Sequence, residues 1–347
     1  MASNAPLVEP RGGTRVQLIW NKGIASLCDH RLPDEFPDGC TYSRVPTFAG
    51  ALSSRRLPEN LISDPQRYAR IQDGDLVWIR VAWLKSFAKK VLPLVNARFV
   101  LVTGDSDSCI PSELPHEVRA LLDSPKITRW YAQNYDGSDR SGKLLPIPIG
   151  IDFHMLSEKP IWGESQSSPE QQEAQLKALL QQLPSIEHRI PAVYVDFPWR
   201  QGFGLFNYRR FHPLVGTKFR ELRRKVAQAL RHNVCVVFQN DPLPRSQMWR
   251  IRGQYAFVLS PHGIGLDCHR TWEALALGHI VLVPSSSLDP MYEGLPLVPL
   301  HAWNEISPAN LQQWLEKFRG FSGLSDGLLS RYWISKMRSV GSRPAMQ

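Results

Sequence analysis

Short runs of β-branched and other apolar residues recur along the chain, and segments with helical spacing of apolar residues separate them. The clearest runs are 98–103 (RFVLVT), 234–238 (VCVVF) and 280–283 (IVLV). A strand that is apolar on both faces is typical of a parallel sheet covered by helices. The alternation of strands and helices occurs twice, on either side of a stretch rich in Pro, Gly and Ser at 155–170. We therefore predict two α/β units, each with a parallel sheet.

The length of 347 residues fits two such domains better than one. We expect an N-terminal α/β domain over 1–155, a linker and helix over 156–185, and a second α/β domain over 186–325. A tail over 326–347 is expected to pack back on the first domain. Residues 16–20 (VQLIW) are the expected first strand, and the prolines of 144–149 (LLPIPI) favour an edge position.

Composition excludes several classes of protein. The five cysteines form no CxxC pair, so neither a disulfide framework nor a zinc module is indicated. No apolar run is long enough for a transmembrane segment, so we expect a soluble, cytoplasmic protein. An origin in the Golgi or ER lumen with a removed anchor is the alternative. The net charge of +9 favours phosphate-bearing partners. The chain has no long basic run of the kind that binds nucleic acid.

Residues 255–283 read as a strand, a glycine loop, a helix and a second strand. Gly263 and Gly265 allow the backbone to approach a ligand closely, and the following helix offers N–H groups to a phosphate. Arg270, in the first turn, is placed to pair with a diphosphate. Glu273 lies on the same helical face and can accept two ribose hydroxyls. The alternative is that Arg270 and Glu273 form an ordinary solvated ion pair.

This segment resembles the nucleotide-sugar-binding core of exostosin-like glycosyltransferases, a group with the GT-B fold. The shared pattern is a glycine loop, an Arg, a Glu-Ala pair and a Gly before an apolar strand. It is matched here by His262-Gly263, Gly265, Asp267, His269-Arg270, Glu273-Ala274, Gly278 and 280–283. The close likeness covers about 40 residues and continues into 284–293 (PSSSLDPMYE). A looser likeness extends back through VTGDSDSC, WYAQNYDG and PIPIGID.

The resemblance implies two Rossmann-like domains that face each other across a cleft, with the donor held mainly by the C-terminal domain and the acceptor on the N-terminal side. It implies that Glu273 binds the ribose and Arg270 the diphosphate. Arg209 and Arg210, in a stretch rich in Arg and aromatic residues, are further candidates for the phosphate. The complete expected donor site is His262, Gly263, Gly265, Asp267, His269, Arg270, Glu273, Arg209, Arg210, Ser285 and Ser286.

No metal and no cofactor are expected, because basic side chains and a helix N-terminus can balance the leaving diphosphate. The nucleotide sugar is a co-substrate, with a UDP-sugar as the first candidate and a GDP-sugar as the second.

Two groups of polar residues follow predicted strands on the N-terminal side. Asp105 and Asp107 are candidates for the general base that deprotonates the acceptor hydroxyl. The alternatives are a DxD site for Mg²⁺ or Mn²⁺ and a turn with an Asp helix cap. Asn134, Tyr135 and Asp136 follow the next strand and could bind acceptor hydroxyls, or form a loop whose polar groups bond one another.

The predicted function is a hexosyl- or pentosyltransferase that moves a sugar from a nucleotide donor to a hydroxyl of a glycan or related acceptor. The resemblance favours inversion, and glycan or polysaccharide biosynthesis as the setting. One alternative is a nucleotide- or glycan-binding protein without catalysis. A nucleic-acid-binding module is the other, suggested by the Arg, Gly and aromatic residues of 197–211, although we expect no nucleic-acid partner.

Overall fold

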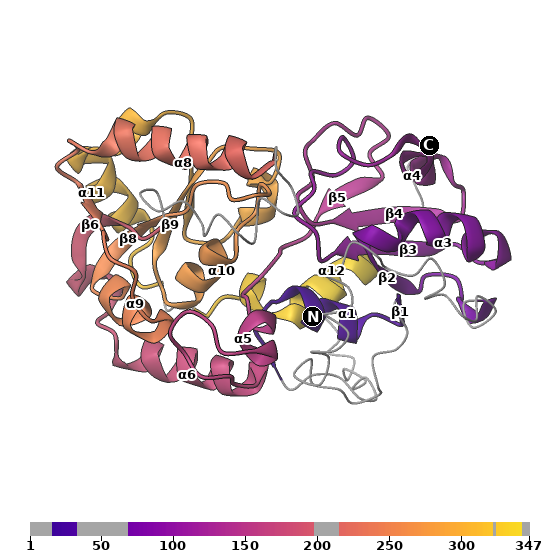
Figure 1. Cartoon of the computed structure of the whole chain (residues 1–347), viewed down its shortest axis with the longest axis horizontal. Helices are drawn as coiled ribbons and strands as arrows, with labels where there is room; N and C mark the ends of the chain where they lie inside the picture. The colour runs from indigo at the N-terminus through magenta and orange to yellow at the C-terminus, as the bar shows by residue number, and fades with distance from the viewer. Residues whose placement is uncertain (1–15, 33–68, 198–214, 322–323, 342–347) are drawn as a thin grey trace, which may run out of the picture.

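The computed structural model describes residues 16–32, 69–197, 215–321 and 324–341, and they form two α/β lobes (Figure 1). Each lobe contains a five-stranded sheet in which every described strand pair is parallel. The strand orders are β1-β2-β3-β4-β5 and β10-β9-β8-β6-β7. The predicted fold class, two Rossmann-like α/β domains, is thereby confirmed. Arg209 and Arg210 lie outside the described residues.

The first sheet precedes the second along the chain. Its strands are β1 (His30–Leu32), β2 (Leu76–Arg80), β3 (Phe99–Gly104), β4 (Ile127–Ala132) and β5 (Leu144–Pro146). Those of the second are β6 (Ile190–Val195), β7 (Val236–Phe238), β8 (Tyr255–Leu259), β9 (Ile280–Pro284) and β10 (Leu297–Leu300). All six residues of β3 are buried, as expected for an apolar strand in the middle of a parallel sheet.

Helices flank both sheets and join them. Figure 1 shows α1, α3, α4 and α12 beside the first sheet, and α8 to α11 around the second. The α-helices are α1 (Asn21–Leu27), α3 (Leu84–Lys90), α4 (His116–Arg119), α5 (His154–Glu158), α6 (Pro169–Gln182), α8 (Val215–Leu230), α9 (Arg245–Arg252), α10 (His269–Ala276), α11 (Pro308–Lys317) and α12 (Ser330–Gly341). Short 3-10 helices occur at Val81–Trp83, Leu92–Leu94, Ala120–Asp123, Ile186–His188, Asp289–Tyr292, Trp303–Glu305 and Asp326–Leu328. None of the helices in the described segments combines the length and apolar character needed to cross a membrane.

One edge strand of each sheet contains a proline. β5 ends at Pro146 and lies at one edge of the first sheet, as the prolines of 144–149 predicted. β10 contains Pro299 and lies at an edge of the second sheet. A proline cannot donate a hydrogen bond to a neighbouring strand, so an edge strand accommodates it best.

Residues 16–20 do not form the first strand of a sheet, contrary to the prediction. They make isolated antiparallel bridges, Leu18 to Leu329 and Trp20 to Gly150, and α1 begins at the next residue. The run is apolar because it is buried where the two lobes meet. Its backbone bonds to other partners: Leu18 N–H donates to Glu173 (2.8 Å) and Ile19 N–H to the carbonyl of Leu328 (2.7 Å).

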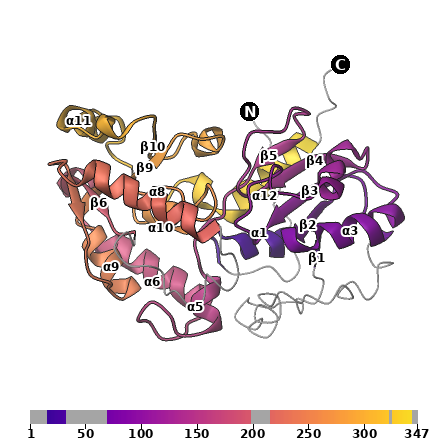
Figure 2. The ribbon, with the colours of Figure 1, turned by 45° about the horizontal axis from the view of Figure 1, so that its top comes forward.

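One apolar core continues from one lobe into the other. It contains Leu76 and Val100 from the first sheet and Val258 and Val281 from the second. Trp333 of α12 belongs to the same core, and both views show α12 within the lobe of the first sheet (Figures 1 and 2). The lobes are therefore packed against each other and are not joined only by a flexible connection.

Candidate functional site

The carboxyl ends of strands from both sheets meet where the lobes touch, a place we call the interdomain seam. In parallel sheets this is the end at which ligands bind. Hydrogen bonds between described residues cross the seam, and three of them show how its two sides are joined. Asp267 N–H donates to Asn134 Oδ1 (2.9 Å), Ser287 Oγ–H donates to the carbonyl of Tyr135 (2.6 Å), and His269 Nδ1 lies 2.6 Å from the carbonyl of Gly150.

The glycine loop, residues 260–268, lies in this seam between β8 and α10. A Cβ atom on Gly263 would be 2.8 Å from Cys268 Sγ and 3.4 Å from a guanidinium nitrogen of Arg223. Arg223 projects from α8, so a second arginine besides Arg270 lies against the loop. The sequence analysis did not assign it a role. In the sequence, only the neighbouring basic residues of the same helix distinguish Arg223.

Gly265 has its own steric reason to be glycine. A Cβ atom there would lie 2.5 Å from the side-chain amide of Asn134, which is fully buried. That amide donates to the carbonyl of Ser106 (3.0 Å) and accepts the N–H of Asp267. Asn134 therefore fixes the glycine loop against the first lobe. Both ends of its amide are bonded within the protein, and the side chain is buried, so contact with the acceptor hydroxyl stays a prediction.

Gly265→Ala is expected to lower the free energy of unfolding by about 1–3 kcal/mol, because the added methyl group overpacks the seam. Chemical denaturation would measure this. Asn134→Ala removes the obstructing amide, so Gly265→Ala should cost clearly less in that background than in the wild-type protein. Equal costs in both backgrounds would show that the contact does not exist.

Arg270 is held in place by a buried carboxylate. Its Nε lies 2.8 Å from Oδ1 of Asp196, the residue that follows β6, and Arg252 pairs with the same side chain. Only 1% of the Asp196 side chain is exposed. Burial acts to raise the pKa of Asp196, but the two guanidinium groups outweigh it and hold that pKa below its usual value. Asp196 was not predicted as a site residue, although a carboxylate directly after a predicted strand was an available signal.

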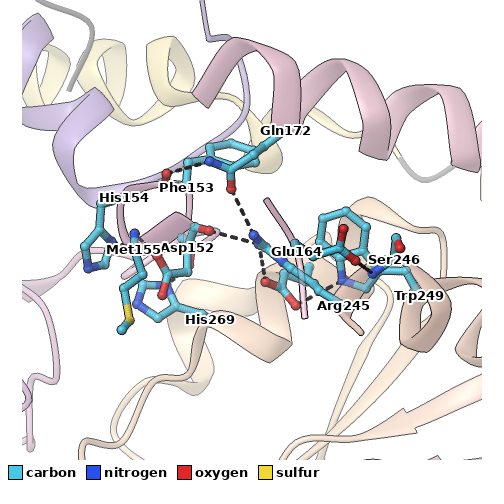
Figure 3. Close-up of polar contacts among 12 residues, drawn as sticks. Asp152, Phe153, His154, Met155, Glu164, Gln172, Arg245, Ser246, Trp249 and His269 are labelled. Carbon is cyan, nitrogen blue, oxygen red and sulfur yellow. Dashed lines mark hydrogen bonds and ion pairs between the residues drawn. The ribbon is translucent and has the colours of Figure 1, made fainter. Parts of the chain in front are cut away.

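Glu273 faces α9. Its carboxylate accepts from Arg245 Nη2 (2.6 Å) and from Trp249 Nε1 (3.2 Å), and Arg252 lies 3.8 Å away. Figure 3 shows Arg245 at the centre of this network, where it also donates to Gln172 and to the main-chain carbonyl of Asp152. Both oxygens of Glu273 are thus engaged within the protein. Binding a ribose, as the resemblance implied, would require exchange of these bonds.

Asp267 and His262 also bond within the protein. Asp267 is buried and accepts from the N–H groups of Ile149 and Cys268 and from Trp272 Nε1. Burial raises its pKa to about 6. His262 Nδ1 lies 2.8 Å from the carbonyl of Leu266, and burial lowers the pKa of this imidazole. Both side chains therefore shape the loop, and a neutral His262 adds no charge to attract a phosphate.

The serines after β9 hold a turn together with Asp289. Ser285 Oγ–H donates to that carboxylate (2.6 Å), and so does the N–H of Ser286 (2.9 Å). Asp136 acts in the same manner in the first lobe, where it accepts the N–H groups of Ser112 and Ser138 (2.9 Å each). At both places the polar side chains therefore stabilise a local turn of the backbone.

The two candidate bases differ in environment. Asp105 lies 2.9 Å from Arg80 and 3.8 Å from Lys22. Burial acts to raise its pKa, but Lys22 and Arg80 bring the pKa to about 2. A carboxylate with so low a pKa is a weak base at neutral pH. Asp107 is exposed. Burial is the main cause that raises the pKa of Cys268, and the charge of Asp107 adds to it, which places Asp107 near the glycine loop.

A cluster of metal-ligating side chains lies beside the loop. Asp152, His154 and His269 each offer one ligand atom, and these atoms lie within 4.8 Å of one another. The sequence analysis predicted no metal and assigned only His269, as a donor contact. Spacing could not indicate the cluster, because His269 is far from the other two along the chain.

Comparison with known proteins gives distant structural likenesses only. No known family model matches the chain, and no curated protein matches it. A structure from E. coli described as trehalose-6-phosphate bound with UDP-2-fluoro glucose is 15% identical, with a TM-score of 0.34 over 85% of this chain and 74% of that one. A UDP-forming alpha,alpha-trehalose-phosphate synthase from Burkholderia vietnamiensis is 13% identical, with a TM-score of 0.39 over 88% and 80%. The GtfA/B complex is 12% identical, with a TM-score of 0.34 over 82% and 61%.

These likenesses are to glycosyltransferases with the GT-B architecture, but with TM-scores below 0.5 they establish no family for this chain. Membership of the exostosin-like family therefore stays a prediction.

Proposed function

We propose that this protein is a glycosyltransferase that binds the diphosphate of a nucleotide sugar at the glycine loop. The observation that carries the proposal is the presence of two arginines around the loop, directly before the N-terminus of α10. Arg223 lies against Gly263, and burial raises the pKa of Cys268 while the charges of Arg223 and Arg270 oppose that effect. Guanidinium groups and helix N–H groups together suit a diphosphate, because its negative charge grows as the glycosyl bond breaks.

The acceptor is a glycan hydroxyl approached from the first lobe. Asp107 is the better candidate for the general base, because it is exposed and lies near the loop, whereas Asp105 is held by Lys22 and Arg80. A single base suffices for transfer with inversion at the anomeric carbon. A UDP-sugar is the first candidate donor and a GDP-sugar the second.

Thermal melting of chelator-treated protein with UDP, GDP, CDP, ADP and their common sugars tests the proposal. One nucleotide series should raise the melting temperature, since a ligand at about 100 times its Kd stabilises the folded state by about 2.7 kcal/mol. Release of the free nucleotide in the presence of glycan acceptors then measures transfer. A shift that requires Mg²⁺ or Mn²⁺ would point to Asp105 and Asp107 as a metal pair, and no shift with any nucleotide sugar would refute the proposal.

A further inference from the structure

Three side chains meet at the connection between the lobes, beside the proposed diphosphate site. Asp152 and His154 lie where the chain leaves the first lobe, at the start of α5, and His269 is the first residue of α10. The His154 and His269 rings are 5.8 Å apart between centroids. Figure 3 shows both imidazoles beside the carboxylate of Asp152.

The surrounding hydrogen bonds orient these side chains. His269 Nδ1 lies 2.6 Å from the carbonyl of Gly150, which can only accept, so Nδ1 carries the proton. In a neutral imidazole the other nitrogen then has the free lone pair, and this arrangement is typical of histidines that bind metals. His154 Nδ1 lies 2.9 Å from Asp152 Oδ1. Asp152 also accepts the N–H of Met155 (3.0 Å), which fixes its carboxylate.

Asp152 is a buried carboxylate whose ion-pair partner is a histidine. Its side chain is 6% exposed, and within the described part of the chain its only ion-pair partner is His154. The nearby cations have other partners: Arg245 pairs with Glu273, while Lys22 and Arg80 pair with Asp105. Buried charges in proteins are paired or coordinate metals, and a metal ion bound by the two imidazoles would also pair with this carboxylate.

We propose that Asp152, His154 and His269 bind one divalent transition-metal ion, with Zn²⁺ as the first candidate. Two imidazoles and one carboxylate are a common donor set for Zn²⁺ and for Co²⁺. Three protein ligands leave coordination room for water or a substrate oxygen. The ion joins the connection between the lobes to α10, the helix that carries Arg270. The inference does not depend on the nucleotide-sugar site, because none of its ligands needs a bound donor.

The test is metal titration of tag-free, chelator-treated protein. Calorimetry with ZnCl₂ should show one equivalent bound, and Co²⁺ should give visible absorption bands that report its ligands. His269→Ala and His154→Ala should each weaken binding at least about tenfold, since each removes one of the ligands. His188→Ala, which removes an exposed imidazole elsewhere, should leave the affinity unchanged.

Titration of the wild-type protein tests whether a metal ion binds, even if a variant does not fold. The absence of stoichiometric binding would overturn the proposal, and so would undiminished affinity in folded His154→Ala and His269→Ala. Failure of the nucleotide panel would leave the metal inference standing, because the two measurements use different ligands and different residues.

Discussion

Asp196→Asn should lower the free energy of unfolding by about 3–5 kcal/mol, the usual cost of removing one partner from a buried ion pair. The carboxylate is almost fully buried between Arg252 and Arg270. An amide cannot balance either guanidinium group, and its NH₂ would face their N–H donors. The substitution keeps the size of the side chain, so the loss measures charge and hydrogen bonding, with no cavity left behind.

Urea denaturation at neutral pH would measure the effect, with Asp123→Asn as the matched control. Asp123 is exposed, and its substitution should change stability by less than about 0.5 kcal/mol. The pKa of Asp196 is lowered in the folded protein, so its contribution is present above the unfolded pKa of about 3.9 and is lost as the pH falls through the folded value. The difference between wild type and variant should therefore narrow in acid. A loss below about 1 kcal/mol at neutral pH would show that the pairing is not as described.

Arg223→Gln and Arg270→Gln should each weaken binding of the donor nucleotide by about 10–100-fold, the expected loss of one charge-assisted hydrogen bond. The Arg223 guanidinium lies beside Gly263, whereas that of Arg270, in the first turn of α10, pairs with Asp196. Arg223→Gln is therefore the cleaner variant, because it leaves the Asp196 ion pairs intact.

Calorimetry with the nucleotide identified by the melting panel would give the affinities. Arg331→Gln is the control, since Arg331 is exposed on α12 beside the first lobe and should not affect binding. Melting curves of each variant without ligand separate a loss of affinity from a loss of fold. Unchanged affinity in Arg223→Gln and Arg270→Gln would place the diphosphate elsewhere.

The sequence predicted those parts of the fold that depend on local pattern. β3, β8 and β9 were found because unbroken apolar runs differ from the helical spacing around them. The same signal failed at 16–20, where an apolar run is buried at the seam and does not enter a sheet. β10 was not predicted, because it is short and contains Pro299.

The residues of the candidate site were likewise predicted only where they lie close together in the sequence. The glycine loop and Arg270 adjoin in the sequence, so their spacing placed them together. Arg223, Asp196 and the cluster around His269 come from elements far apart in the chain, and their pairing depends on how the lobes pack. Glu273 shares a helix with Arg270 as predicted, but its partners lie on α9, which the spacing within α10 could not reveal.

The return of the chain to the first lobe has a consequence during translation. Residues 16–20 are bonded to 328–330, and α12 packs on α1 beside the first sheet. The ribosome makes all five strands of the second sheet before it makes α12. A domain usually folds as soon as its own residues have emerged. Here the first lobe has to wait for a helix encoded after the second, so Leu18 lacks its bridge partner Leu329 while most of the polypeptide is synthesised, and the lobe that begins first is completed last.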